Sequence, residues 1–353
     1  MSGRLKLRRG IVVGEDPLTV EVGGERRPAW ADAGLLGEMR EGDEVVVNCA
    51  ALDLGLGSGG FDVVHANLTR GLDGGPAGEE HVIKLNYSSL QHPVDPVELP
   101  LRFLGPRETK GAVEGSERAM PVLVLPLHGH LAPAAWSAAQ AAPGPKVGFV
   151  QSGGGALPGS LSRDVAELRE RGLLCGHVTA APAYGGEHEA LSVAGALDAA
   201  ADRLGWEAAI VGPGPGIIGS DTRLGHGGMA ALDSAHAALA LGLPTILSPR
   251  LSAADPRERH RGVSHHTMTV LQLLLAPVEL PIPAGNPEIA TQLSDATGAR
   301  HKLHEVSVAL DAYATSGLPA RTMGRGIDDD PLFYAAPLAA GHHLSSSSAG
   351  GVG

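Results

Sequence analysis

Short apolar segments separated by turn residues make up the first hundred positions of the chain. Few windows here have helical periodicity, and the turn pairs Asp16-Pro17 and Gly23-Gly24 stand at hairpin spacing. Many short strands with close turns are typical of small barrels and sandwiches. We therefore predict a β-rich domain over residues 1–105, a barrel or a sandwich, with strands at Leu5–Val13, Leu18–Val22, Glu44–Ala51, Phe61–Leu68 and His81–Leu85.

The pattern changes at residue 121, where apolar strands begin to alternate with helical windows. This alternation predicts parallel βαβ units, and therefore a doubly wound, mostly parallel α/β domain over residues 121–335. The polar residues 106–120 are the predicted linker, and the low-complexity residues 336–353 are predicted to be a disordered tail. The expected strands are Pro121–Leu127, Lys146–Gln151, Leu173–Thr179, Ala208–Gly212, Pro244–Ser248 and Pro277–Pro281, and the expected helices are Ala132–Ala142, Ser160–Arg171, Glu187–Leu204, Leu224–Leu241 and Ser264–Leu275.

Composition narrows the classes of function. The 353 residues are 43% hydrophobic but only 3% aromatic, so the core must consist mainly of Ala, Val, Leu and Ile. A formal charge of −12 argues against general binding to nucleic acid or to an anionic membrane surface. Cys49 and Cys175 lie far apart and favour reduced thiols, no apolar segment follows the basic start, and no run approaches the roughly 18 apolar residues of a membrane span. These features predict a cytoplasmic protein.

Residues 248–267, which we call the Arg/His loop, are unlike the acidic chain around them. The loop follows an apolar strand and precedes a helix, and in open α/β sheets such loops at the carboxyl ends of strands bind ligands. Guanidinium groups suit phosphate or carboxylate, and neutral imidazoles suit metals or proton transfer. The alternative is a solvated turn whose charges pair locally. The candidate anion-binding residues are Arg250, Arg257, Arg259 and Arg261, and the loop also holds His260, His265 and His266.

Ser264 is the predicted N-cap of the helix that ends the loop, which places two histidines in the first helical turn. Successive helical residues point about 100° apart, so we expect only one of the two imidazoles to face a ligand. We expect His265 to be that residue, and His266 to pack or to cap.

Two glycine-rich loops also follow predicted strands, at Gly148–Asp164 and Ile210–Gly228. Glycines let backbone amides approach an anion closely, which makes Gly153, Gly154, Gly214 and Gly216 candidate ligand-binding residues. Neither loop has the spacing of a phosphate-binding or dinucleotide-binding fingerprint. Tight strand-to-helix turns are therefore the alternative explanation.

Histidines from several of these loops could meet at one edge of the sheet. Converging His and Asp side chains are typical of divalent-metal sites. The chain has no H-E-x-x-H motif, and histidines that only form structural hydrogen bonds remain the alternative. The candidate metal ligands are His128, His130, Asp221 and His226, and the only cofactor that the residues suggest is a divalent metal.

The strings GPGPGIIGSDTRLGHGG, RHRGVSHHT, LPLHGHL and NLTRGLDGG give a resemblance that extends over nearly the whole chain. On these segments, the chain resembles a bacterial family catalogued as domain of unknown function 3866. The resemblance implies a bacterial cytoplasmic protein and carries no activity, substrate or catalytic residue.

These candidates predict an enzyme that binds a small anionic metabolite, phosphorylated or nucleotide-like, through the Arg/His loop. Hydrolysis or group transfer suits the residues better than hydride transfer, because no dinucleotide fingerprint is present. His226, His265 and His266 are the candidate catalytic residues, for proton transfer or metal binding. The alternative is a non-catalytic protein for anion sensing or assembly, and Ala-rich helices leave a homo-oligomer open.

Overall fold

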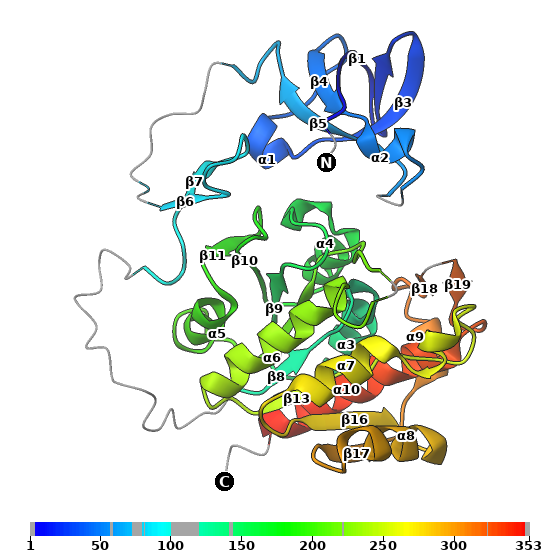
Figure 1. Cartoon of the computed structure of the whole chain (residues 1–353). Coiled ribbons are helices and arrows are strands. Elements are labelled where there is room, and N and C mark those ends of the chain that lie inside the picture. Colours follow the sequence, from blue (N-terminus) through cyan, green and yellow to red (C-terminus); the bar gives the residue numbers. More distant parts are fainter. Residues whose placement is uncertain are drawn as a thin grey trace. The chain divides into compact units, whose positions relative to one another are not determined.

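The structure, a computed structural model, describes residues 4–56, 59–72, 80, 82–99, 120–140, 144–220, 222–322 and 324–349. The chain forms two compact units, Met1–His81 and Val82–Gly353 (Figure 1). The division precedes the predicted linker, most of which lies outside the described residues. The segment Val82–Leu99 therefore belongs to the second unit and not to the β-rich domain, because its side chains pack on that unit's sheet.

The first unit contains a closed five-stranded barrel, so the predicted small barrel is confirmed. Its interior is filled by apolar side chains that alternate along the strands, among them Val12, Val20, Val45 and Val47. The barrel order is β1(Leu7–Glu15), β2(Leu18–Val22), β3(Glu25–Trp30), β5(Asp62–Asn67) and β4(Glu44–Asn48), with short helices α1(Ala33–Leu36) and α2(Ala50–Asp53) between strands.

The second unit is built on an eight-stranded sheet in which all neighbouring strands are parallel, which confirms the predicted α/β domain. Its central strands are buried on both faces and rich in Val, Leu, Ile and Ala, as is typical of parallel sheets. The order is β11(His188–Ala190), β10(Gly176–Ala180), β9(Val147–Ser152), β12(Ala208–Pro213), β8(Val122–Val124), β13(Thr245–Leu247), β16(Glu279–Pro283) and β17(Lys302–Val306).

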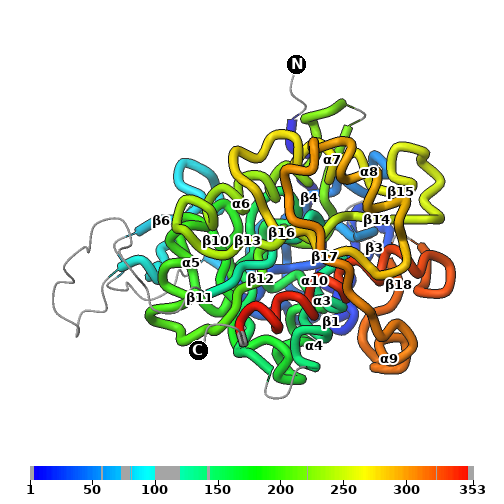
Figure 2. Tube along the Cα trace, turned by 90° about the horizontal axis from the view of Figure 1, so that it is seen from below, coloured from blue at the N-terminus to red at the C-terminus, as the bar shows by residue number. Residues whose placement is uncertain are grey.

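Helices cover both faces of this sheet, so the unit has three layers (Figure 2). One face packs against α5(Val193–Asp202), α6(Ala230–Ala240), α7(His265–Leu273) and α8(Pro287–Thr297). The other face packs against α3(Leu131–Ala138), α4(Arg163–Glu170), α9(Leu310–Ala314) and α10(Pro331–Ala349). No helix in the described part of the chain is long and apolar enough to cross a membrane.

The connections reverse direction at the centre of the sheet. The chain runs outward from β8 to β11, returns to place β12 beside β8, and then continues through β13 on the other side. In open parallel sheets, ligands bind beside the carboxyl ends of strands at such reversals. The loops that follow β12 and β13 lead into α6 and α7, and they carry the histidines of interest.

Two predicted features of the second unit are wrong. Residues 336–349 are not disordered but form most of α10, whose small side chains lie close against α3: a Cβ at Gly341 would come within 2.1 Å of the Ala134 carbonyl oxygen. The predicted helix Glu187–Leu204 begins only at Val193, because His188–Ala190 pairs with β10 as strand β11. In both places tertiary contacts outweigh local composition.

A hairpin of β6(Val82–Lys84) and β7(His92–Val94) begins the second unit. The ammonium group of Lys84 is buried and donates to the carbonyls of Thr179 and Ala183 and to the Glu189 carboxylate. Beyond the hairpin, the Val97 amide donates to the Glu189 carbonyl at 2.8 Å, and the Arg203 guanidinium donates to the carbonyl of Val97. These bonds attach the segment to the β10–β11 side of the sheet.

Candidate functional site

The Arg/His loop follows β13 and forms a hairpin of two short strands, each of two residues, before α7 begins. Its strands are β14(Leu251–Ser252) and β15(Gly262–Val263), with a single 3-10 turn at Glu258–His260 between them. The predicted N-cap is confirmed: the Ser264 hydroxyl accepts a hydrogen bond from the His266 amide at 3.3 Å. The cap fixes where α7 begins, and with it the position of His265 and His266.

Four imidazoles form one cluster at the beginning of α7. The rings of His226 and His266 are stacked, with centroids 3.7 Å apart and planes at 9°. His265 contacts His266 at a centroid distance of 4.4 Å, and His260 lies 4.9 Å from His265. His226 comes from the loop after β12, so the fold unites two loops that are separated by β8 in the sheet.

Three of these histidines lie close enough together to hold a metal ion. His226, His265 and His266 each offer one ligand atom, and these atoms all lie within 4.8 Å of one another. Nδ1 of His226, Nε2 of His265 and Nδ1 of His266 are buried without a hydrogen-bond partner. The other ring nitrogen of His226 bonds the Arg223 carbonyl at 3.0 Å, so it must carry the proton and Nδ1 keeps its lone pair.

Gly228 leaves room beside two of these free nitrogens. A Cβ at this position would lie 3.0 Å from His226 Nδ1 and 3.4 Å from His266 Nδ1. A side chain at this position would therefore crowd both nitrogens. The backbone of Gly228 has no positive φ that would by itself require glycine.

Burial keeps the cluster neutral. It lowers the pKa of all four imidazoles, to about 3 for His260 and about 2 for His266, and nearby arginines and histidines lower it further. Groups with such low values are poor proton acceptors at neutral pH, because a general base works best near the operating pH. Neutral imidazoles are, however, the form that binds metals. The arrangement favours metal coordination over proton transfer.

His266 packs as expected, because its ring stacks on that of His226, and the expectation that only His265 faces a ligand stays a prediction. His265 is half-buried and His266 is buried, yet the two rings contact each other and both belong to the three-ligand group. Successive helical residues differ by about 100° in the direction of their Cα–Cβ bonds, but the rings at the ends of the side chains can still meet. His226, from the loop after β12, contacts both rings.

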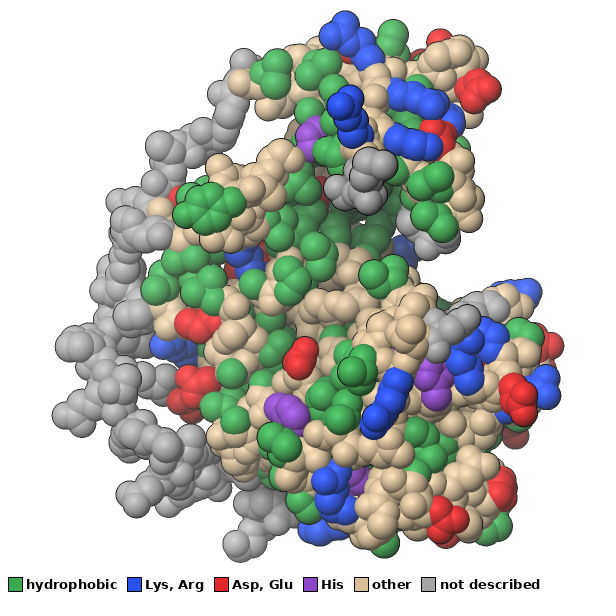
Figure 3. Space-filling view, viewed as in Figure 1, with side chains coloured by type: hydrophobic (Ala, Val, Ile, Leu, Met, Phe, Trp, Pro, Cys, Tyr) green, Lys and Arg blue, Asp and Glu red, His purple; other side chains and the backbone are tan. Residues whose placement is uncertain are grey.

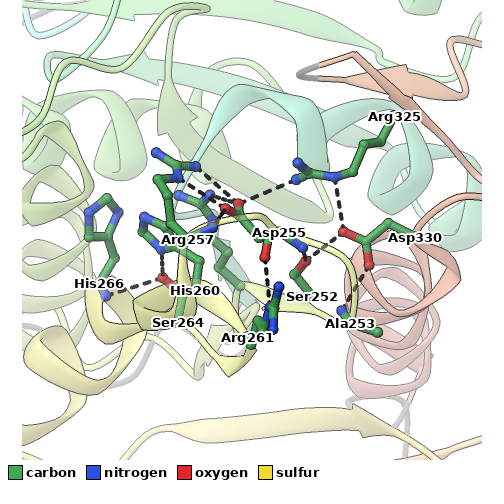
Figure 4. A network of polar contacts seen from close by, with 11 residues as sticks. Ser252, Ala253, Asp255, Arg257, His260, Arg261, Ser264, His266, Arg325 and Asp330 are labelled. Atoms are coloured by element: carbon green, nitrogen blue, oxygen red, sulfur yellow. Dashed lines mark hydrogen bonds and ion pairs between the residues drawn. The ribbon is translucent and has the colours of Figure 1, made fainter.

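The arginines of the loop converge on a buried carboxylate that the sequence did not single out (Figure 4). Asp255 is fully buried and forms ion pairs with Arg250 at 3.2 Å, with Arg257 at 3.0 Å and with Arg325 at 3.3 Å. These charged hydrogen bonds hold the pKa of Asp255 far below its usual value, although burial alone would raise it. The local pairing considered as the alternative is thus real for Arg250 and Arg257.

A second carboxylate joins this network to α10. Asp330 is buried immediately before the helix, and it accepts hydrogen bonds from the Ser252 hydroxyl at 2.6 Å and the Ala253 amide at 2.9 Å. Arg325 lies 3.3 Å from Asp330 and bridges it to Asp255. The three guanidinium groups and two carboxylates leave one net positive charge beside the histidines.

The other two arginines of the loop, Arg259 and Arg261, are exposed. Arg261 donates through Nε to the Asp255 carbonyl at 2.9 Å, which leaves its terminal amino groups directed away from that carboxylate. Figure 3 shows a histidine beside Lys or Arg side chains on the visible face of the second unit. Anion binding by the four loop arginines stays a prediction.

The glycine-rich loops pack against each other. A Cβ at Gly154 would lie 2.6 Å from the Gly227 carbonyl oxygen, and one at Gly214 would lie 2.2 Å from that of Ala156. Gly153 has a similar contact with the Pro182 ring, whereas Gly216 is exposed with φ 71°. Close loop packing therefore explains most of these glycines, and their role in ligand binding remains untested.

Of the other candidate metal ligands, His128 and His130 are not part of the three-histidine group. His128 bonds the Pro213 carbonyl at 3.1 Å and the Ser162 hydroxyl at 2.7 Å, so both its ring nitrogens are occupied. His130 bonds the Ser248 hydroxyl at 3.0 Å and packs on Phe333. Asp221 lies outside the described residues.

The fold and this histidine cluster define a parallel α/β protein with a small barrel unit and a candidate metal centre. The family model described as "Protein of unknown function (DUF3866)" matches residues 29–341. Because the match extends over most of the chain, the protein belongs to this family. No curated protein and no solved structure matches it.

The buried neutral histidines predict a loss of stability in weak acid. A histidine whose pKa falls on folding stabilises the fold fully above its unfolded value of roughly 6.5, and this contribution decreases as the pH falls toward the folded value. The free energy of unfolding of the metal-free chain should fall by up to about 1.4 kcal/mol per pH unit for each such histidine. Urea unfolding between pH 7 and pH 5 measures it, and His266→Asn should reduce the slope.

The exposed His342, on helix α10, provides the control. His342→Asn should keep the wild-type slope. An unchanged slope in His266→Asn would contradict the buried neutral state of that imidazole.

Proposed function

We propose that His226, His265 and His266 bind a divalent transition-metal ion, and that the protein hydrolyses a small anionic substrate there. The observation that supports this most directly is the convergence of three buried ring nitrogens without partners, all within 4.8 Å. Imidazole ligands favour zinc and other first-row transition metals over magnesium or calcium, which prefer oxygen.

The donor atoms are within reach of one ion. Ligands held at 2.0–2.1 Å in a tetrahedron are about 3.4 Å apart, so the side chains would rotate on binding, and the stacked rings of His226 and His266 would turn out of parallel. Three protein ligands leave a fourth position for water or substrate, which is the pattern of catalytic rather than structural zinc sites. A bound ion would supply a water that ionises near neutral pH.

The surroundings suit an anion. Three neutral imidazoles do not reduce the charge of a divalent ion, and the Arg–Asp network adds one net positive charge. Arg259 and Arg261 are exposed at the same loop and would meet phosphate or carboxylate groups. We place the reaction in the cytoplasm, which the two free cysteines, Cys49 and Cys175, support.

Metal analysis and turnover test this proposal. Tag-free protein should bind zinc, cobalt or manganese after treatment with a chelator, and the metal-loaded form should hydrolyse at least one member of a panel of phosphate mono- and diesters and carboxylic esters. His265→Ala should lose the metal ion bound at the three histidines and the turnover, and keep its fold, and the His342→Asn protein is the matched control.

Two results would contradict the proposal. Absence of metal at the three histidines would remove its basis. Metal and anion binding without any turnover would favour the non-catalytic sensing or assembly function instead.

A further inference from the structure

A second group of potential metal ligands lies away from the Arg/His loop, at the β16–β17 edge of the sheet. It consists of Glu279 on β16, His304 on β17 and His343 on α10, whose ligand atoms all lie within 4.8 Å. Glu279 is the first residue of its strand, whereas the histidine cluster follows the carboxyl ends of β12 and β13. The two groups therefore belong to different ends of the sheet.

The strand register explains why the first two side chains meet. Pro281 pairs with His304 across the parallel ladder, and Glu279 precedes Pro281 by two residues. Residues two apart point to the same face of a sheet, so Glu279 and His304 share a face. Helix α10 packs across that face and brings His343 to it.

Both imidazoles direct Nε2 at one carboxylate oxygen. His343 Nε2 lies 2.6 Å from Glu279 Oε2, and His304 Nε2 lies 3.7 Å from the same atom. The second distance is too long for a hydrogen bond, and His304 Nε2 is buried without a partner. The two ring centroids are 4.3 Å apart.

The 2.6 Å distance is that of a hydrogen bond, whereas the 3.7 Å distance leaves His304 Nε2 available to a shared ion. Donor atoms on one tetrahedral zinc are about 3.4 Å apart, a value between the two that are observed. A hydrogen bond from His343 would use one side of the carboxylate only, and it leaves His304 Nε2 buried beside the same oxygen without a hydrogen-bond partner.

We propose that Glu279, His304 and His343 form a second transition-metal site, of the two-histidine, one-carboxylate type, which fastens α10 to the edge of the sheet. The side chains of Glu279 and His304 are 30% and 36% exposed, so water can complete the coordination. The inference is independent of the proposed function, because it uses other residues and another end of the sheet.

Zinc stoichiometry tests it on the full chain, purified without a histidine tag and stripped with a chelator. Wild type should bind two zinc ions. His304→Gln and His343→Gln should each bind one, with affinity at this site weakened by about 100-fold or more. Zinc should also raise the Tm of wild type more than that of either variant. His342→Gln, at the neighbouring exposed position, should match wild type.

The His226→Ala, His266→Ala double variant separates the two sites. It should retain one zinc ion and its stabilisation. A double variant that binds no zinc, or His304→Gln and His343→Gln proteins with the wild-type stoichiometry, would overturn the second site whatever the outcome at the first. A double variant with both ions would instead overturn the three-histidine site alone.

Discussion

A Gly228→Ala protein should fold like wild type and yet bind zinc at the three-histidine site about 100-fold or more weakly. The added Cβ would lie 3.0 Å from His226 Nδ1 and 3.4 Å from His266 Nδ1, and it would compete for space with an ion bound to these atoms. A 100-fold loss of affinity corresponds to a loss of about 2.8 kcal/mol in binding free energy. The substitution removes no ligand and places no residue at positive φ, so it tests the position of the ion. Zinc competition titration and Tm measure the two effects.

Gly219 provides the matched control on the same loop. A Cβ there would meet the Cβ of His226 at 3.3 Å and none of the ring nitrogens within 4 Å. Gly219→Ala should therefore keep most of the affinity. Wild-type zinc affinity in Gly228→Ala would show that no ion occupies the space between the two Nδ1 atoms.

The largest effect on stability is expected for Asp255→Ala, which should lower the free energy of unfolding of the second unit by about 3–5 kcal/mol. The carboxylate is fully buried, and so is the Arg250 guanidinium that it neutralises, with a side chain only 3% exposed. Removing one partner of a buried ion pair leaves the other charge without compensation. Urea unfolding, followed by circular dichroism at pH 7, gives the change.

Asp328, which is exposed in the same C-terminal region as Asp330, provides the comparison. Asp328→Ala should change stability by less than about 0.5 kcal/mol. A similarly small change in Asp255→Ala would mean that the arginines find other partners. Because the pKa of Asp255 is lowered on folding, its contribution persists above roughly pH 3.9 and declines only below it, well under the range where the histidines act.

The order of the elements in the second unit follows closely from the sequence, because strands buried on both faces are continuous apolar runs bounded by Gly and Pro. The elements that escaped prediction lack that signal. Strand β17 is amphipathic and lies at the sheet edge, and β3 carries three charged residues in six positions. Helix α10 ends in a run of serines, a composition typical of disordered segments. The small side chains of the helix nevertheless allow it to pack closely on α3.

The candidate site was predictable in part for a related reason. A helix N-cap followed by two histidines marks the beginning of α7, and His226 stands in a loop that the strand order brings to it. The partners of the arginines could not be found in this way, because Asp255 and Arg325 are 70 residues apart and only the tertiary fold brings them together. The same holds for Gly228, because only the tertiary fold places it beside His226 and His266.

The attachment of residues 82–99 to the sheet has a consequence for how the second unit can be produced alone. Strand β11 is an edge strand, and its Glu189 carbonyl accepts a hydrogen bond from the Val97 amide. A fragment that begins at residue 121 would expose this edge and leave the carboxylate of Glu189 without the Lys84 ammonium group. Unpaired sheet edges recruit strands from other molecules. A fragment that begins at residue 82 keeps its edge covered. We therefore expect this fragment to be monodisperse and the fragment that begins at residue 121 to aggregate.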